Sequence, residues 1–149
     1  MKISTRGRYA LRVLIDLAEH ADQGYTPMKI IAERQGISLK YLEQIVPVLS
    51  RSELISGIQG KGGGYKLNRQ PSEVTVGEVL RLTEGDLAPV SCLECDAKPC
   101  ERTGICKTLP MWKEFNHMIN HFFDSITLSR LMNDKDYQAD FMAEPALLI

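Results

Sequence analysis

Gly36 constrains the fold most, because it separates two short helical patterns by a single tight turn. Before it, Thr26 can cap a helix and Pro27 can occupy the first helical position, which proline tolerates. After it, Ser38 can cap a second helix, whose second half Pro47 is expected to kink or loosen. Two short helices joined by a glycine-containing turn predict a helix-turn-helix. The apolar face expected for the second helix is Leu39, Leu42, Val46 and Leu49.

A glycine-rich run at residues 60–64 follows the second helix. Apolar residues on both sides of the run, from Ile55 to Leu67, predict a β-hairpin with the glycines at its tip. A phosphate-binding loop is disfavoured, because Ile55 stands where its first glycine is required and no Ser or Thr follows Lys61. A hairpin directly after a helix-turn-helix is typical of a winged helix, whose wing approaches DNA phosphates or the minor groove. A flexible hairpin without that role is the alternative.

Two further helices complete the predicted N-terminal unit, residues 1–85. An amphipathic pattern over residues 4–20 begins at Ser4 or Thr5 and carries arginines near its start. These arginines, Arg6, Arg8 and Arg12, indicate either a solvated basic face or contact with phosphate groups. A capping box at residues 75–78 starts a short helix that ends at Gly85. Its expected apolar residues are Val76, Val79, Leu80 and Leu82.

Charge is distributed unevenly along the 149 residues. Residues 1–70 contain 11 Lys or Arg against 6 Asp or Glu, whereas residues 71–149 contain 7 against 13. A basic half joined to an acidic half favours a polyanion-binding surface over a small-molecule enzyme. The sequence contains no run of about 18 apolar residues and no signal-like N-terminal segment. We therefore expect a cytoplasmic protein with no membrane partner.

All four cysteines of the chain lie within fifteen residues and are spaced C-x2-C-x4-C-x5-C. Disulfides are disfavoured in a reducing cytosol, so this pattern indicates metal or redox chemistry. Thiolates bind zinc and iron-sulfur clusters alike, and spacing separates the two poorly. From the residues alone we favour an iron-sulfur cluster, then zinc, then a thiol redox switch. We expect residues 86–108, the cysteine loop, to become ordered only when its ligands close on a metal.

A continuous apolar stripe follows the cysteine loop over about four helical turns. Four of its eight residues are aromatic, too many for one helix on so small a domain to hide alone. The stripe therefore predicts a dimerisation helix rather than a ligand pocket, and a homodimer suits two-fold, palindromic DNA. The stripe consists of Met111, Trp112, Phe115, Met118, Ile119, Phe122, Phe123 and Ile126. Dimer contacts are expected from Trp112, Phe115, Met118, Ile119, Phe122 and Phe123.

The end of the chain completes the expected layout. Thr127 can cap a last short helix that ends at Met132, so dimerisation helices are expected over residues 109–133. Residues 134–149 are acidic and show no periodic pattern, which is consistent with a disordered tail. The predicted fold class is thus mainly α with a small β-hairpin: a winged helix-turn-helix, the cysteine loop and a long dimerisation helix.

With these elements placed, the sequence resembles the IscR family of bacterial iron-sulfur cluster regulators. IscR belongs to a broader winged-helix family that includes nitric-oxide sensors and regulators of cysteine metabolism. The matching motifs are MKISTRGRYA at residues 1–10, QGIS at 35–38, YLEQ at 41–44, GGGY at 62–65, and Trp112 followed by SITL at 125–128. The resemblance implies a homodimeric transcription factor, commonly a repressor of cluster-assembly genes. Its DNA affinity would change with cluster occupancy, and the assembly machinery would donate the cluster.

The resemblance also assigns roles to the cysteines. The three family ligands fall on Cys92, Cys100 and Cys106, and Cys95 is an additional thiol. In the well-known branch a histidine three positions after the last cysteine completes a two-iron cluster, but this chain has Leu109 there. Cys95 is the nearest candidate for the fourth ligand. His117 and His121 lie beyond it on the long helix and are explained equally well as ordinary helix residues, and in related sensors an acidic side chain of the partner subunit can serve. A [2Fe-2S] cluster is favoured over a [4Fe-4S] cluster, with zinc as the alternative.

The expected DNA contacts come from the first helix, the second helix of the helix-turn-helix and the wing. Gln44 can pair with adenine, and Lys40 can donate to guanine or phosphate. Glu43 repels phosphate unless it meets a cytosine amino group, so it is expected to select against wrong sites. Family wings often carry arginine where this chain has Gln59. The full set is Thr5, Arg6, Arg8, Ser38, Lys40, Tyr41, Glu43, Gln44, Gln59, Lys61 and Gly62.

Two alternative functions remain open at this point. One is a repressor of the same fold that senses nitric oxide or thiol state through the cysteine loop. The other, more remote, is a thiol or metal-dependent enzyme. Against an enzyme, His20, His117 and His121 form no metal or triad pattern with the cysteines, and no nucleotide-binding fingerprint occurs. We therefore expect a regulator that is not an enzyme.

Overall fold

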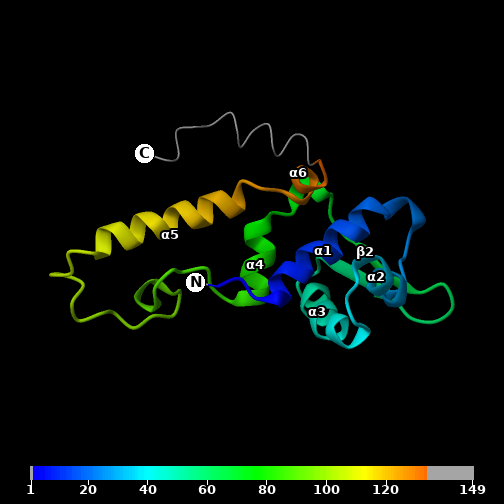
Figure 1. The fold of residues 1–149 in the computed structure, drawn as a ribbon, viewed down its shortest axis with the longest axis horizontal. Helices are drawn as coiled ribbons and strands as arrows, with labels where there is room; N and C mark the ends of the chain where they lie inside the picture. The colour runs from blue at the N-terminus through cyan, green and yellow to red at the C-terminus, as the bar shows by residue number, and fades with distance from the viewer. Residues whose placement is uncertain (1, 134–149) are drawn as a thin grey trace.

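The computed structural model describes residues 2–133 and confirms a mainly helical fold with one small β-hairpin. The molecule is elongated, with the N-terminal helices and the hairpin at one end and the cysteine loop at the other (Figure 1). No helix in this part of the chain is long and apolar enough to cross a membrane. The elements are α1 (Thr5–Glu19), η1 (Ala21–Gln23), α2 (Met28–Gln35), α3 (Leu39–Arg51), β1 (Ile55–Ile58), β2 (Gly64–Leu67), η2 (Pro71–Glu73), α4 (Val76–Glu84), η3 (Ser91–Leu93), α5 (Leu109–Asp124) and α6 (Leu128–Met132).

The start of α1 is tied to the end of α4. Ser4 caps α1 as predicted, because its hydroxyl accepts a hydrogen bond from the Gly7 N–H at 3.2 Å. The same hydroxyl donates to Glu84 Oε1 at 2.7 Å. Gly7 allows the close approach, since a Cβ there would collide with the Glu84 side chain and lie 3.1 Å from Leu80. The two helices therefore pack where both a cap and a glycine permit it.

The predicted cap of α2 is wrong, because Thr26 pairs with the hairpin instead. Pro27 is the N-cap residue, and no side chain caps this helix. Thr26 is buried, its N–H donates to the Tyr65 carbonyl at 2.8 Å, and its own carbonyl accepts from the Tyr65 N–H at 2.8 Å. Thr26 thus extends the hairpin edge by one bridge. The predicted end of α2 is confirmed, with Gly36 in the left-handed conformation at φ 62°.

The second helix of the helix-turn-helix, α3, begins as predicted. Ser38 Oγ accepts a hydrogen bond from the Tyr41 N–H at 3.3 Å. The helix continues through Pro47 to Arg51, so the proline does not end it. Leu39 was expected in the core but is 43% exposed, because the buried face is formed by Leu42, Ile45, Val46 and Leu49. Leu39 stands at the first helical position, beyond the edge of that face.

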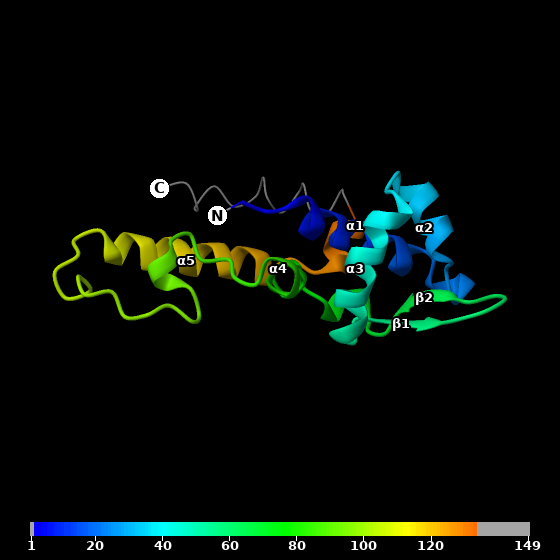
Figure 2. The same ribbon diagram turned by 90° about the horizontal axis from the view of Figure 1, so that it is seen from below.

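The hairpin pairs β1 and β2 antiparallel, with Ile55 opposite Leu67 and Ile58 opposite Gly64. Gly64 has φ 156° and lies directly against Thr26, where a Cβ would collide with the Thr26 carbonyl group. This contact explains why β2 begins with a residue that lacks a side chain. The tip projects away from the body of the molecule (Figure 2).

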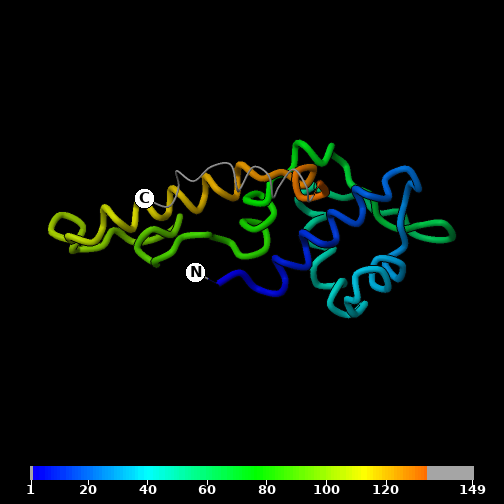
Figure 3. The backbone as a smooth tube through the Cα atoms, turned by 45° about the horizontal axis from the view of Figure 1, so that its top comes forward, coloured from blue at the N-terminus to red at the C-terminus, as the bar shows by residue number. Residues whose placement is uncertain are grey.

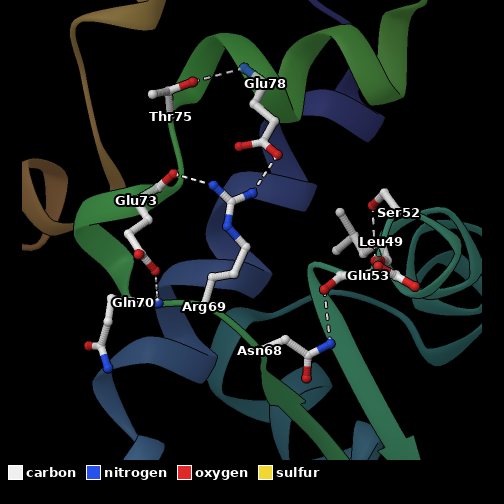
Figure 4. A network of polar contacts seen from close by, with 9 residues as sticks. All are labelled: Leu49, Ser52, Glu53, Asn68, Arg69, Gln70, Glu73, Thr75 and Glu78. Carbon is white, nitrogen blue, oxygen red and sulfur yellow. Dashed lines mark hydrogen bonds and ion pairs between the residues drawn. The ribbon is translucent and has the colours of Figure 1, made fainter.

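A polar network fastens the base of the hairpin to α4 (Figure 4). Asn68 Nδ2 donates to the Glu53 carbonyl at 2.9 Å, and Arg69 forms an ion pair with Glu78 at 2.7 Å. Thr75 caps α4 by accepting from the Glu78 N–H at 3.1 Å. The reciprocal half of the predicted capping box is not formed, because the Glu78 carboxylate bonds Arg69. Leu82 was expected to be apolar core and is exposed.

Two hydrophobic clusters hold the fold together. The larger joins α1, α2, α3 and the hairpin with Val79 of α4 and Leu128 of α6, and the smaller joins α4, α5 and the segment leading to α6. Asp16 is buried within the first region at 1% exposure, where Arg34 Nη2 donates to it at 2.7 Å and Gln35 Nε2 at 3.0 Å. This buried carboxylate links α1 to the end of α2 and requires both donors.

The long helix α5 divides its apolar residues between two faces. Ile119 and Phe123 pack into the smaller cluster against α4, and Ile126 lies buried just beyond the helix. Arg81 of α4 donates to Asn120 Oδ1 at 3.0 Å and pairs with Asp124. Ile119, one of the residues predicted to form dimer contacts, is buried to 8% exposure by its own chain, which leaves little of its side chain at the surface. The last helix begins as predicted, with Thr127 as its side-chain cap.

Candidate nucleic-acid interface and metal centre

Most of the predicted recognition residues of α3 are exposed. Ser38, Lys40, Glu43 and Gln44 face solvent, while Tyr41 is half-buried. Tyr41 is held from behind, since its ring packs edge-to-face on Tyr9 of α1 with centroids 5.4 Å apart. The helix thus presents two charged side chains and an amide on a surface fixed by an aromatic contact. Such a surface can read base edges in a major groove.

The arginines of α1 take three different roles. Arg12 stacks over the Tyr9 ring at 5.2 Å and donates to the Gln35 side chain at 3.2 Å, so it braces the helix-turn-helix. Arg8 is exposed and donates to Thr5 Oγ1 at 3.0 Å. Arg6 is half-buried, and its Nε has no hydrogen-bond partner within the described part of the chain. Arg8 therefore presents its guanidinium to solvent, whereas Arg6 is half-buried and Arg12 is engaged with Tyr9 and Gln35.

The wing presents its predicted residues at the tip. Gln59, Lys61 and Gly62 are all exposed there. Gly62 has φ 78°, and a Cβ at Gly63 would collide with the Ile58 carbonyl. Side chains are thus excluded from part of the turn, which leaves the backbone amides and Lys61 accessible.

Three of the four cysteines line one cavity of about 90 Å³ between the cysteine loop and the first turns of α5. The loop runs out beside α5 and turns back into it (Figure 3). Leu109 lies on the same wall and offers no ligand atom. It occupies the position at which the resemblance noted above implies a histidine ligand. The lining residues are Cys92, Leu93, Cys100, Thr103, Cys106, Leu109 and Lys113.

Cys95 does not line this cavity, because Asp86 holds it elsewhere. Its N–H donates to Asp86 Oδ2 at 2.7 Å, and the Ala88 N–H donates to Asp86 Oδ1 at 2.6 Å. The hydrogen bond from the Cys95 N–H lowers the pKa of Asp86. The side-chain hydrogen bond with this carboxylate and its charge raise the pKa of the Cys95 thiol. The hydrogen bond to Asp86 and the charge of Asp86 both oppose the thiolate form of Cys95, which is the form that binds a metal.

Cys106 is placed in the opposite environment. Its sulfur lies 3.4 Å from Thr108 Oγ1, and this hydrogen bond lowers the pKa of the thiol. The thiolate is therefore favoured at Cys106 and disfavoured at Cys95. Residues 2–133 contain no group of three His, Cys, Asp or Glu side chains already close enough to hold a metal ion. The cysteines share a cavity wall but are not drawn into a finished coordination sphere.

The expected dimerisation face of α5 is exposed along one line. Met111, Phe115, Met118 and Phe122 are 42–52% exposed, and they follow one another at spacings of four, three and four residues. Trp112 is half-buried, and Phe123 packs against the smaller cluster. The remaining stripe therefore has the spacing of a helix-packing seam.

Sequence reasoning missed the residues around the thiols. Asp86, Thr108 and Lys113 have no spacing motif that points to them, since each acts through the path of an irregular loop or the start of α5. One local signal was available for Thr108, because a hydroxyl two residues after a candidate thiolate ligand is within reach of its sulfur.

Comparison with known proteins places the chain in a family. A family model described as an iron-dependent transcriptional regulator, Rrf2, matches residues 3–134. The regulator IscR of Aliivibrio salmonicida is 38% identical over 139 residues, covering 93% of this chain and 81% of that protein. IscR of Serratia proteamaculans is 36% identical over 137 residues, covering 91% of this chain and 82% of that protein.

Two solved structures resemble this chain in both sequence and fold. The global cysteine regulator CymR of B. subtilis is 37% identical with a TM-score of 0.73, covering 91% of this chain and 99% of that one. IscR of T. potens is 34% identical with a TM-score of 0.70, covering 100% of this chain and 93% of that one. The chain therefore belongs to the Rrf2 family of winged-helix transcriptional regulators.

Proposed function

We propose that this chain is a repressor of iron-sulfur cluster assembly genes whose affinity for DNA is controlled by an iron-sulfur cluster in the cysteine loop. The cavity lined by Cys92, Cys100 and Cys106 is the observation that carries the proposal. Membership of the Rrf2 family and similarity to IscR proteins support the choice of function and cofactor. The cluster-assembly machinery is the proposed donor.

The residues fit such a group in their chemistry. Cysteine thiolates are the usual ligands of iron-sulfur clusters, and three of them line one wall. Thr108 favours the thiolate of Cys106, and Lys113 brings a positive charge to a cavity that would hold several negative sulfurs. When bound, the cluster would supply a redox-sensitive, labile centre. A [2Fe-2S] cluster is the favoured type, and zinc is the alternative occupant.

Cys95 is a weak candidate for the fourth ligand. Its backbone and thiol are engaged with Asp86, outside the cavity that the other three cysteines share. To bind, Cys95 must leave this carboxylate and the loop must rearrange. We therefore propose that Cys92, Cys100 and Cys106 form the permanent ligand set and that Cys95 contributes less.

The DNA-binding surface combines α3, the wing and the start of α1. Lys40 and Gln44 are the proposed base-reading residues, and Glu43 disfavours sites without a cytosine amino group. Lys61 at the wing tip and Arg8 on α1 are the proposed phosphate contacts. Neutralising several phosphates makes the binding strongly salt-dependent.

A homodimer matches this surface to a palindromic operator. The exposed line of Met111, Phe115, Met118 and Phe122 on α5 is the proposed interface. Leaving these four side chains in water is unfavourable, and pairing α5 with its copy removes them from solvent. Two recognition helices related by a two-fold axis would then read two half-sites.

The described contacts provide a route from the cysteine loop to the recognition helix. Arg81 of α4 contacts α5, Glu84 of α4 bonds Ser4 of α1, and Tyr9 of α1 packs on Tyr41 of α3. Closing the loop on the first turns of α5 would bias the position of α5 and, through these contacts, of α3. This is a two-state mechanism in which the loop selects one arrangement.

The cluster is tested by anaerobic isolation of the full chain. We expect a coloured protein that contains iron and acid-labile sulfide, and Mössbauer spectra separate the two cluster types. Cys92→Ala, Cys100→Ala and Cys106→Ala should each abolish the colour, whereas Cys95→Ala should weaken it. A colourless protein that contains only zinc would overturn the cluster proposal. Binding to a palindromic duplex, measured with and without the cluster, then tests control.

The coupling route is tested by Arg81→Ala. We expect this variant to keep the visible spectrum of the cluster but to lose most of the difference in DNA affinity between loaded and cluster-free protein. Arg69→Ala is the matched control, because Arg69 also pairs with a carboxylate of α4 but does not contact α5. An unchanged affinity ratio in Arg81→Ala would contradict the route.

A further inference from the structure

Two histidines on α5 lie outside the cysteine cavity and have no role in the function proposed above. His117 and His121 are both exposed, and their rings stack with centroids 6.3 Å apart and an interplanar angle of 14°. Within the described part of the chain, neither ring has a hydrogen-bond partner. His20, in contrast, is engaged through Nδ1 with the Asp16 carbonyl at 2.7 Å.

The backbone beneath this pair is firmly placed. Ile119, between the two histidines, is buried to 8% exposure in the smaller cluster. Asn120 on the same turn accepts a hydrogen bond from Arg81 at 3.0 Å and donates back to Asn116. The spacing of four residues is therefore held by a packed helix rather than by a fraying end.

Two imidazoles at this spacing can chelate one metal ion. A tetrahedral zinc ion with Zn–N bonds of about 2.0–2.1 Å needs its two nitrogens roughly 3.3 Å apart. Because both side chains are exposed, rotation about their side-chain bonds can bring the rings together at little steric cost. Helical histidine pairs four residues apart bind zinc in other proteins by the same geometry.

We propose that His117 and His121 form a second metal site, which takes one divalent transition ion of the zinc class. Imidazole suits zinc, nickel and copper(II), and the pair supplies two ligands. Residues 2–133 offer no third His, Cys, Asp or Glu that completes a three-residue group here, so the proposed site consists of the two imidazoles alone. The site is independent of the cluster in the cysteine loop.

The test is a Zn²⁺ titration of the full chain, followed through the NMR signals of the three histidine rings. The titration uses the cluster-free chain, in which we expect the loop thiolates to bind the first zinc more tightly while the ring signals of His117 and His121 stay in place. Further zinc should then shift both signals together, along one binding curve. His20 is the internal control and should not shift.

Single variants separate a chelate from two independent histidines. His117→Ala should weaken zinc binding at His121 by about tenfold or more, and His121→Ala should do the same at His117, because the second ligand no longer acts at high local concentration. Both substitutions replace exposed residues with a good helix former, so the fold is retained. The proposal is overturned if His121 titrates at the same zinc concentration in His117→Ala as in the wild type, or if neither ring shifts.

Discussion

The winged region and the cysteine loop of the same chain are stabilised in different ways. Residues 4–85 are fixed by side-chain caps on α1, α3 and α4, by a buried carboxylate with two donors, and by close backbone contacts at Gly7 and Gly64. In the cysteine loop most side chains are exposed, and the regular structure there is one short 3-10 turn, η3. The hydrogen bonds of the loop reach at most nine residues along the chain, from Cys95 to Asp86.

This difference indicates which part of the fold is specified by its own contacts. The winged region buries enough apolar surface to specify itself, and its core needs no ligand. The cysteine loop buries only Leu87, so under the proposed function its order would come from the bound cluster. Under the proposed function this division is useful, because the sensing segment could change while the DNA-reading segment stays folded.

The largest effect is expected when a glycine of the winged region is replaced by alanine and compared with the same substitution in the cysteine loop. Gly64→Ala should lower the free energy of unfolding by about 3 kcal/mol, because the Cβ would collide with the Thr26 carbonyl at a backbone conformation that favours glycine. Gly104→Ala in the cysteine loop is the control, since a Cβ there meets nothing within 4 Å. It should change stability by no more than about 0.5 kcal/mol in the same urea titration. Equal losses of stability in the two variants would mean that the winged region and the cysteine loop do not differ in how they are stabilised.

A smaller effect of the same kind is expected from removing one carboxylate charge. Asp16→Asn should cost about 2 kcal/mol, because the buried side chain at position 16 loses the charge that pairs with Arg34. Asp86→Asn should leave the unfolding midpoint nearly unchanged, because its partners lie in the loop. Thermal unfolding of the three proteins, followed by circular dichroism, measures both values. A loss at Asp86 as large as that at Asp16 would mean that the loop belongs to the cooperative core.

Sequence reasoning succeeded where a residue acts on its own neighbours. Ser4, Ser38 and Thr127 were predicted as caps because a hydroxyl bonds the N–H two or three positions ahead, and Gly36 was predicted as a terminator because of its own dihedral freedom. These interactions are encoded within a few residues. The winged-helix order of elements followed from them.

Prediction failed where the outcome depends on distant partners. Thr26 has the chemistry of a cap, but a bridge to Tyr65 takes its backbone into the hairpin edge. The stripe on α5 gave no sign of which residues α4 would cover, so it did not reveal that Ile119 is buried within its own chain. The spacing of the cysteines likewise could not reveal that Asp86 draws Cys95 away from the other three.

The smallest expected effect concerns the thiols of the cluster-free loop. Iodoacetamide attacks thiolates, so Cys106, whose pKa is lowered by Thr108, should be alkylated at a lower pH than Cys95, whose pKa is raised by Asp86. As the pH rises through the range in which thiols ionise, the difference in rate should narrow. Peptide mass spectrometry measures both rates in one sample.

Asp86→Asn provides the decisive comparison for these rates. Removing the carboxylate removes the interaction that raises the pKa of Cys95, so its alkylation should accelerate near neutral pH and shift to lower pH. The rate at Cys106 should not change, because its partner is Thr108. Equal acceleration at both thiols would mean that Asp86 orders the whole loop. Acceleration at Cys95 alone would show that this carboxylate acts locally, to hold one thiol apart from the other three.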